Sequence, residues 1–201
     1  MQVATFLLDY NFLLEDLNTM KFHIRTLLVL LFLSFTLNAC DSAEPDHDHA
    51  GEEELITRVV VTLTSGTETV TANANDPDGD GTGFEIDPIV LSSGTTYSGS
   101  ITLWDDVNLE NITEEIEEED DEHQFFYTVG GGVSDRVDVS ITDRDSNNLP
   151  VGLTFDLVVS DGGPASGTLN VVLSHFDDQP KNGSDRSDET DVNVTFTISL
   201  Q

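Results

Sequence analysis

Residues 191–200, DVNVTFTISL, alternate strictly between polar and apolar side chains. The apolar positions are Val192, Val194, Phe196, Ile198 and Leu200. A period of two is typical of a β-strand that buries one face and exposes the other. This stretch therefore predicts a half-buried strand, and the rest of the chain can be compared with it.

The same alternation recurs before this stretch. It is found at 59–63, 70–74, 97–103, 137–141, 151–157 and 169–175, and the segment 125–129 is aromatic and β-prone. Turn-forming residues separate most of these segments, and a further apolar run at 84–91 is broken by Pro88, which favours an edge strand. About eight or nine strands in one small domain predict an all-β fold. We expect an antiparallel β-sandwich, immunoglobulin-like in shape, with a closed barrel as the alternative.

One segment, 111–123, departs from this pattern. Asn111 and Glu114 have the spacing of a helix-capping pair, and Ile112, Ile116 and His123 share one helical face. The segment therefore predicts one short acidic helix between strands.

The N-terminal region predicts export. Residues 20–40, MKFHIRTLLVLLFLSFTLNAC, combine a basic start, an apolar run too short to span a bilayer, and the only cysteine of the chain. The end of this segment resembles the lipobox of bacterial lipoproteins. The resemblance implies that Cys40 becomes the first, lipidated residue of the mature chain; a secreted protein with a chance cysteine is the alternative.

These features divide the chain into four parts. Residues 1–19 are acidic and unlike a signal peptide, so we expect translation to begin at Met20. Residues 20–39 are the expected signal peptide. Residues 40–54 lack apolar periodicity and predict an acidic, flexible tether, and residues 55–201 are the expected β-sandwich domain.

Charge and motifs limit the functions to consider. The chain has 39 acidic and 7 basic residues, a formal net charge of −32, which disfavours nucleic acid as a partner. Cations, basic proteins or neutral glycans remain as partners, with simple solubility as the alternative. There is no glycine-rich phosphate loop and no nucleophile elbow, so we expect neither an enzyme nor an organic cofactor.

A zinc site is the first candidate. Residues 114–122 hold eight carboxylates in nine positions, and His123 follows them directly. His175 continues the apolar face of 169–173. Should the helix and strand ends converge, imidazoles and carboxylates would form a site that suits Zn²⁺. The predicted ligands are His123, His175, Glu119, Glu122 and Asp177. The alternatives are a solvated acidic helix and a structural histidine.

Two weaker metal candidates accompany it. His47 and His49 lie in the tether and can bind a transition metal weakly, or can belong to a plain linker. The second candidate is a calcium loop with the Asp-x-Asp-x-Asp-Gly spacing, where a plain turn is the alternative. Its predicted ligands are Asp76, Asp78, Asp80 and Asp87.

Several segments together carry a family resemblance. They are the lipobox, the acidic tether, the Asp-Gly-Asp-Gly turn at 78–81, the segment 117–127 and Ser174-His175-Phe176. With these the chain resembles a family of small Bacteroidetes-type lipoproteins whose members tend to carry the label of a type 1 periplasmic-binding fold. That fold has two α/β lobes, whereas the pattern of this chain predicts one short helix.

The resemblance also bears on function. The family is similar to lipoprotein companions of outer-membrane TonB-dependent receptors in metal uptake, which implies zinc handling and an outer-membrane transporter as a partner. The acidic residues after Cys40 resemble a surface-export signal, which implies the outer face of the outer membrane, with the periplasmic face as the alternative. We therefore expect a non-catalytic binding module for a divalent metal, zinc before calcium. The alternative is a structural or adhesive surface lipoprotein with calcium-stiffened loops, which binds proteins or glycans.

Overall fold

The computed structural model describes residues 54–177 and 179–201. The predictions made for the signal peptide, for Cys40 and for the tether histidines His47 and His49 lie outside the described residues.

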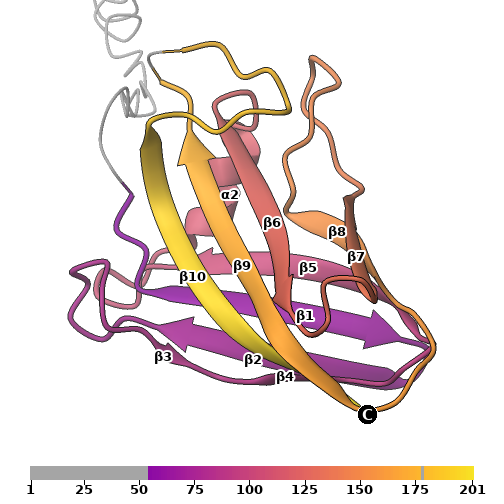
Figure 1. Cartoon of the computed structure of the whole chain (residues 1–201). Helices are drawn as coiled ribbons and strands as arrows, with labels where there is room; N and C mark the ends of the chain where they lie inside the picture. Colours follow the sequence, from indigo (N-terminus) through magenta and orange to yellow (C-terminus); the bar gives the residue numbers. More distant parts are fainter. Residues whose placement is uncertain (1–53, 178) are drawn as a thin grey trace, which may run out of the picture. The chain divides into compact units, whose positions relative to one another are not determined.

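The described chain forms two β-sheets whose strands cross one another (Figure 1). The first sheet has six strands in the order β3 (Glu85–Ile86), β2 (Glu68–Asn75), β1 (Arg58–Ser65), β5 (Thr96–Trp104), β8 (Thr154–Val159) and β7 (Val137–Ile141). The second has four, in the order β4 (Ile89–Leu91), β10 (Glu189–Leu200), β9 (Ala165–His175) and β6 (His123–Gly131). This arrangement confirms the predicted all-β sandwich, although β4 pairs with β10 in parallel rather than antiparallel.

One apolar core joins the two sheets. The five apolar residues of the alternating segment 191–200 are all buried in it, as the period of two predicts. Tyr97, Phe125, Phe155 and Phe196 are its largest fully buried side chains. Gly99 pairs with Phe155 across β5 and β8, and a Cβ at Gly99 would collide with the Phe155 ring. The strand therefore needs a glycine at this position.

The apolar run 84–91 differs from its prediction. We expected one edge strand, but the run forms two short strands on either side of Pro88. β3 lies at the edge of the six-stranded sheet, and β4 lies at the edge of the four-stranded sheet. Proline has no N–H to donate to a ladder, so the chain leaves one sheet at this residue and joins the other.

The predicted helix is present but shorter. α2 (Ile112–Glu118) buries Ile112, Thr113 and Ile116, and the Thr113 hydroxyl bonds to the backbone N–H and C=O of Leu103. The Asn111 side chain does not cap the helix; it donates to Glu114 Oε1 instead. The helix ends before the acidic residues 120–122, which a helix C-terminus disfavours because its dipole is negative there. His123 consequently begins β6 and is not part of the helix.

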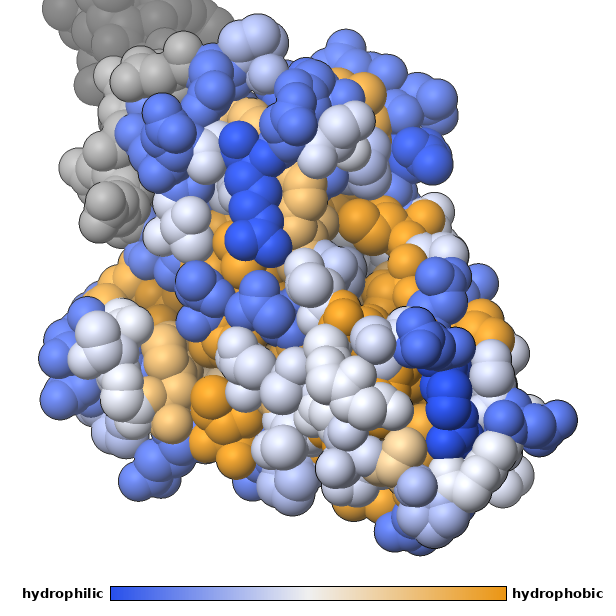
Figure 2. All heavy atoms as spheres, viewed as in Figure 1, coloured by the Kyte–Doolittle hydropathy of each residue, from blue (hydrophilic) through white to orange (hydrophobic). Residues whose placement is uncertain are grey.

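Much of the outer surface is hydrophilic, as the high content of acidic residues predicts. The end of the domain that holds the loops 142–153 and 176–188 is largely hydrophilic in Figure 2, and apolar residues gather in strips below it. Among the described residues, no helix is both long enough and apolar enough to cross a membrane.

Candidate metal centre

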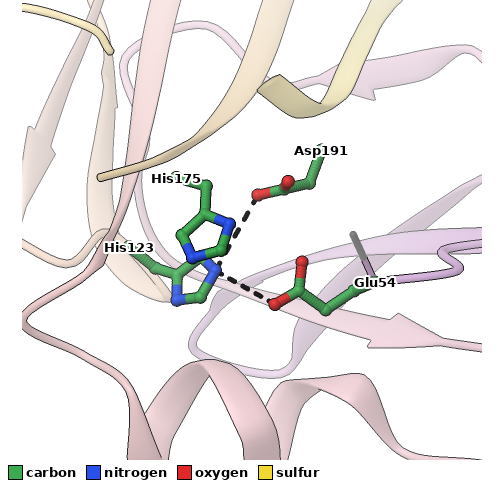
Figure 3. Close-up of side chains that lie close together, drawn as sticks. All are labelled: Glu54, His123, His175 and Asp191. Carbon is green, nitrogen blue, oxygen red and sulfur yellow. Dashed lines mark ion pairs between the residues drawn. The ribbon is translucent and has the colours of Figure 1, made fainter. Parts of the chain in front are cut away.

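Four side chains meet at one end of the four-stranded sheet (Figure 3). They are Glu54, His123, His175 and Asp191, and one potential ligand atom from each lies within 4.8 Å of all the others. They come from the segment before β1, the start of β6, the end of β9 and the start of β10. The site therefore depends on the tertiary fold and not on any local motif.

Strand register brings the two histidines together. His123 and His175 are directly opposed residues of the antiparallel β6–β9 pair. Such residues have neighbouring side chains on the same face of a sheet. Their rings stack with centroids 4.4 Å apart and planes inclined by 17°. Both histidines are buried, and they meet as paired residues of two strands rather than at the expected meeting of a helix end and a strand end.

A β-bulge brings Asp191 into the cluster. The register between β9 and β10 shifts between Thr190 and Val192, so Asp191 is the extra residue of its strand. Bulges re-aim side chains next to functional sites. The Asp191 side chain is only 2% exposed, and its Oδ2 lies 3.8 Å from His123 Nε2.

Glu54 completes the cluster from the segment that leads into the six-stranded sheet. It precedes β1, and its side chain is 8% exposed. Its Oε1 lies 3.3 Å from His123 Nε2, and its buried Oε2 has no hydrogen-bond partner among the described residues. Our boundary placed Glu54 in the flexible tether, whereas here its side chain is packed against the domain.

The hydrogen bond at Nδ1 of His123 determines whether Nε2 carries a proton or a lone pair. Nδ1 lies 3.2 Å from the backbone oxygen of Glu119. A carbonyl oxygen can only accept, so Nδ1 carries the proton of that bond. In a neutral ring, Nε2 then presents a lone pair toward the carboxylates of Glu54 and Asp191. This arrangement is repulsive unless a proton or a cation lies between the three groups.

The pKa shifts of His123 and Glu54 indicate that a proton can lie between these groups. Burial lowers the pKa of His123, but Glu54, the Glu119 carbonyl and Asp191 raise it by more, so the pKa lies above its ordinary value. Burial raises the pKa of Glu54, and His123 lowers it by more, so that pKa lies below its ordinary value. Without a metal, the cluster thus favours an imidazolium between carboxylates.

The separations are close to those of a zinc site. Tetrahedral Zn²⁺ with ligand distances of about 2.0–2.2 Å holds its ligands about 3.4 Å apart. The His123–Glu54 distance of 3.3 Å already has this value, and the His123–Asp191 distance of 3.8 Å is slightly larger. A shift of less than about 1 Å per side chain would therefore bring the ligand atoms of His123, Glu54 and Asp191 to bonding distance from one Zn²⁺ ion.

The sequence predicted only half of the cluster. Glu119 contributes its backbone carbonyl rather than its carboxylate, because the helix has ended there. Glu122 Oε2 lies 4.0 Å from His175 Nε2, and its side chain is 48% exposed, so it borders the cluster without entering it. Asp177 is exposed and lies outside the cluster. Glu54 and Asp191 take the places predicted for these acids.

The predicted calcium loop is assembled in part. Asp76, Asp78 and Asp80 lie close together, but Asp87 is not in their group and accepts hydrogen bonds from Asn73 instead. The buried Asp76 accepts backbone N–H bonds from Gly79 and Gly81. A hydrogen bond with Asp76 and the charge of Asp80 raise the pKa of Asp78. Backbone amides therefore already satisfy the one buried carboxylate of this loop.

A pocket lies next to the histidine cluster. It has a volume of about 320 Å³ and is lined by His175, Gln179, Asp188 and Glu189. It reaches the cluster from the side of His175, and its acidic lining suits the approach of a cation.

Comparison with known proteins adds no assignment: no protein-family model matches the chain, and a search of curated proteins found no match.

Proposed function

We propose that this protein is a non-catalytic binding module whose β-sandwich holds a divalent cation at Glu54, His123, His175 and Asp191. One observation carries the proposal. The Nδ1 proton of His123 bonds to the Glu119 carbonyl, so Nε2 faces two buried carboxylates. The ring nitrogen of a metal-bound histidine is commonly oriented in this way, through a hydrogen bond from its other nitrogen.

The donor set favours zinc over calcium. Two imidazole nitrogens and two carboxylates suit Zn²⁺ and similar transition metals, whereas Ca²⁺ takes six to eight oxygen ligands. The buried part of the cluster supplies too few oxygens for calcium.

Loading requires one ring to move. The lone pairs of an imidazole lie in its plane, so two stacked rings inclined by only 17° cannot both aim at one ion. His175 borders the pocket, whereas His123 is held by the Glu119 carbonyl. We therefore assign the rotation to His175.

The cellular setting follows from the sequence. The lipobox at Cys40 supports a lipid anchor in the outer membrane, and the acidic segment after it supports exposure at the cell surface, with the periplasmic face as the alternative. An outer-membrane transporter is the partner that best fits a metal-binding lipoprotein. The anchor and the surface exposure rest on the resemblance of the segment 20–54, and the transporter rests on the family resemblance described above.

Thermal unfolding of the full chain in mild detergent, stripped with a chelator, tests the proposal. Zinc at 100 times its Kd should add about 2.7 kcal/mol of stability. For a domain of this size, the melting temperature then rises by several degrees. The double variant His123→Gln/His175→Gln should lose this rise, while the matched tether variant His47→Gln/His49→Gln should keep it.

Other outcomes distinguish the alternatives. A rise with calcium alone, lost in Asp78→Asn/Asp80→Asn, would support the structural or adhesive surface function instead. A zinc effect of equal size in the double histidine variant would place the metal elsewhere. No effect of either ion would contradict a metal-binding function.

A further inference from the structure

We propose a second binding site, independent of the metal centre, for a small organic carboxylate that also carries hydroxyl groups. It is a pocket of about 330 Å³ along β6, and His123 is not among its lining residues. Its walls come from β6, β7, the loop 142–153 and residues 183–184. β6 and β7 are edge strands of their respective sheets, so no further strand pairs with either at this side of the described domain. The volume falls in the range of small-molecule sites.

A buried, unsatisfied acceptor points to a ligand. Gln124 is 2% exposed and lines the pocket. Its Nε2 donates to the Gly183 carbonyl, while its Oε1 has no hydrogen-bond partner among the described residues. Exchanging the two amide ends would set two acceptors against each other, so Oε1 is the buried end without a partner in the described chain. A buried acceptor without a partner costs about 1–3 kcal/mol, which a hydroxyl donor of a ligand would recover.

The positive charge at the pocket is unusual for this protein. Arg144 lines the pocket, and the Arg186 guanidinium lies 5.6 Å from the ring centroid of Phe126, another lining residue. The described chain has only three other basic side chains. Arg58 pairs with Asp106, Lys181 pairs with Asp145, and Arg136 bonds to the carbonyls of Ser160 and Gly163. One arginine thus lines the pocket and a second stacks on one of its lining residues, in a chain with a net charge of −32.

The Asp143 carboxylate, which lies near the pocket, is held by hydrogen bonds to the backbone. Asp143 acts electrostatically on Tyr127, which also lines the pocket. The oxygens of Asp143 accept backbone N–H bonds from Gly152 and Thr154. Arg144 itself donates to the Asn148 carbonyl, which leaves further donors of its guanidinium for an anion.

These features define the chemistry of the ligand. The arginines select an anionic group, and a carboxylate fits the planar guanidinium. Gln124 Oε1 selects a hydroxyl donor. Hydroxylated carboxylates such as sugar acids combine both groups in a molecule of suitable size. Glucuronate is therefore the probe, glucose lacks the carboxylate, and acetate lacks the hydroxyl groups.

The test is ligand-observed NMR and calorimetric titration of the full chain, stripped of metal, with each of these three compounds. Glucuronate should bind at least tenfold more tightly than glucose or acetate. Arg144→Gln should weaken glucuronate binding at least tenfold, while the charge-matched control Arg58→Gln should not change it. Gln124→Leu removes the unpaired acceptor Oε1 without introducing a new polar group, so the domain should stay folded. Glucuronate binding should also weaken in this variant.

Each contrary result has a defined meaning. Absence of glucuronate binding would overturn the proposal, as would equal binding of glucose, which would remove the role of charge. Unchanged binding in folded Arg144→Gln or in folded Gln124→Leu would show that the pocket is not the site. None of these outcomes depends on zinc, so failure here and failure of the metal centre are distinguishable.

Discussion

Among the described residues, two groups that contain acidic side chains are close enough to hold a cation, and they differ in how the protein has already compensated their charge. In the loop 76–81, three aspartates come from one short segment, and the buried one accepts two backbone N–H bonds. In the metal centre, four side chains come from four distant segments, and a histidine nitrogen faces two carboxylates. Proximity of carboxylates is common to both groups.

The two groups differ in whether the protein itself stabilises their carboxylates. Backbone amides stabilise a carboxylate without any ligand, as in turns built on aspartate. The loop therefore has a complete structural explanation, and its two other aspartates are exposed to solvent. The buried centre keeps Glu54 Oε2 without a hydrogen bond in the described chain, and it needs a proton or a metal between its groups. Uncompensated burial, rather than the number of acids, identifies the better candidate.

The largest expected effect comes from removing the two acids that the structure assigns to the centre. The double variant Glu54→Gln/Asp191→Asn should lower zinc affinity at least about 100-fold, since even residues that only orient metal ligands are worth about 10–100-fold each. The matched variant Glu119→Gln/Asp177→Asn, built from the acids predicted by sequence, should leave affinity within about twofold. Competition titration with a zinc-binding dye measures both. Equal losses in the two variants would mean that general negative charge holds the metal.

The next effect concerns stability at the loop. Asp76→Ala leaves the N–H groups of Gly79 and Gly81 without their acceptor and should destabilise the domain by about 1–3 kcal/mol. Chemical denaturation with and without calcium measures this change. The loss should be the same under both conditions, because the carboxylate serves the backbone. A loss seen only in calcium would make the loop a true ion site.

The pH dependence should be smaller and has a defined sign. The pKa of His123 is raised from 6.5, so its contribution to metal-free stability is complete below about pH 6.5 and is lost as pH rises through the folded pKa. The pKa of Glu54 is lowered from 4.5, so its contribution is present above about pH 4.5 and is lost as pH falls through the folded value. The metal-free centre should therefore stabilise the domain most between these two pH values.

Zinc should reverse the upper half of this profile. A metal competes with the His123 proton, so the stabilisation by zinc should increase as pH rises past the folded pKa of His123. Unfolding of stripped and zinc-loaded protein at about pH 5.5 and about pH 8.5 measures the difference. The groups that face the ring are Glu54, Asp191 and His175, with Glu122 beside His175. His123→Gln should flatten both profiles, and a profile unchanged in this variant would assign the titration to another group.

The smallest effect is expected for the exposed aspartates of the loop. Asp78→Asn and Asp80→Asn should each change stability by less than about 0.5 kcal/mol, as for most surface substitutions. Removing Asp78 or Asp80 also relieves the repulsion that raises the pKa of Asp78, so a slight gain is the expected direction. Calcium should not shift the melting temperature of the parent or of either variant.

The sequence predicted the sandwich and the histidine pair for one shared reason. Both depend on the period of two, which places Leu173 and His175 on the same face of a strand. Asp191 was missed because the same period places it on the polar face beside Val192, and the bulge that redirects it arises from pairing with β9. Glu54 was missed because it ends an acidic run; its one local signal was the adjacent apolar pair Leu55 and Ile56, of which Ile56 is buried. Long-range pairing, which no local pattern encodes, fixed both acids.

The position of β10 has a consequence for the order of events in the cell. β10 lies inside the four-stranded sheet, between β4 and β9. Ile89 of β4 therefore cannot pair until its partner Ile198 in β10 is present. Pairing over such sequence separations makes folding slow. The four-stranded sheet cannot form before β10 has been synthesised, and Asp191 reaches His123 only when β10 has paired with β9. Any metal bound by all four side chains of this centre would therefore be acquired only after β10 has joined the sheet.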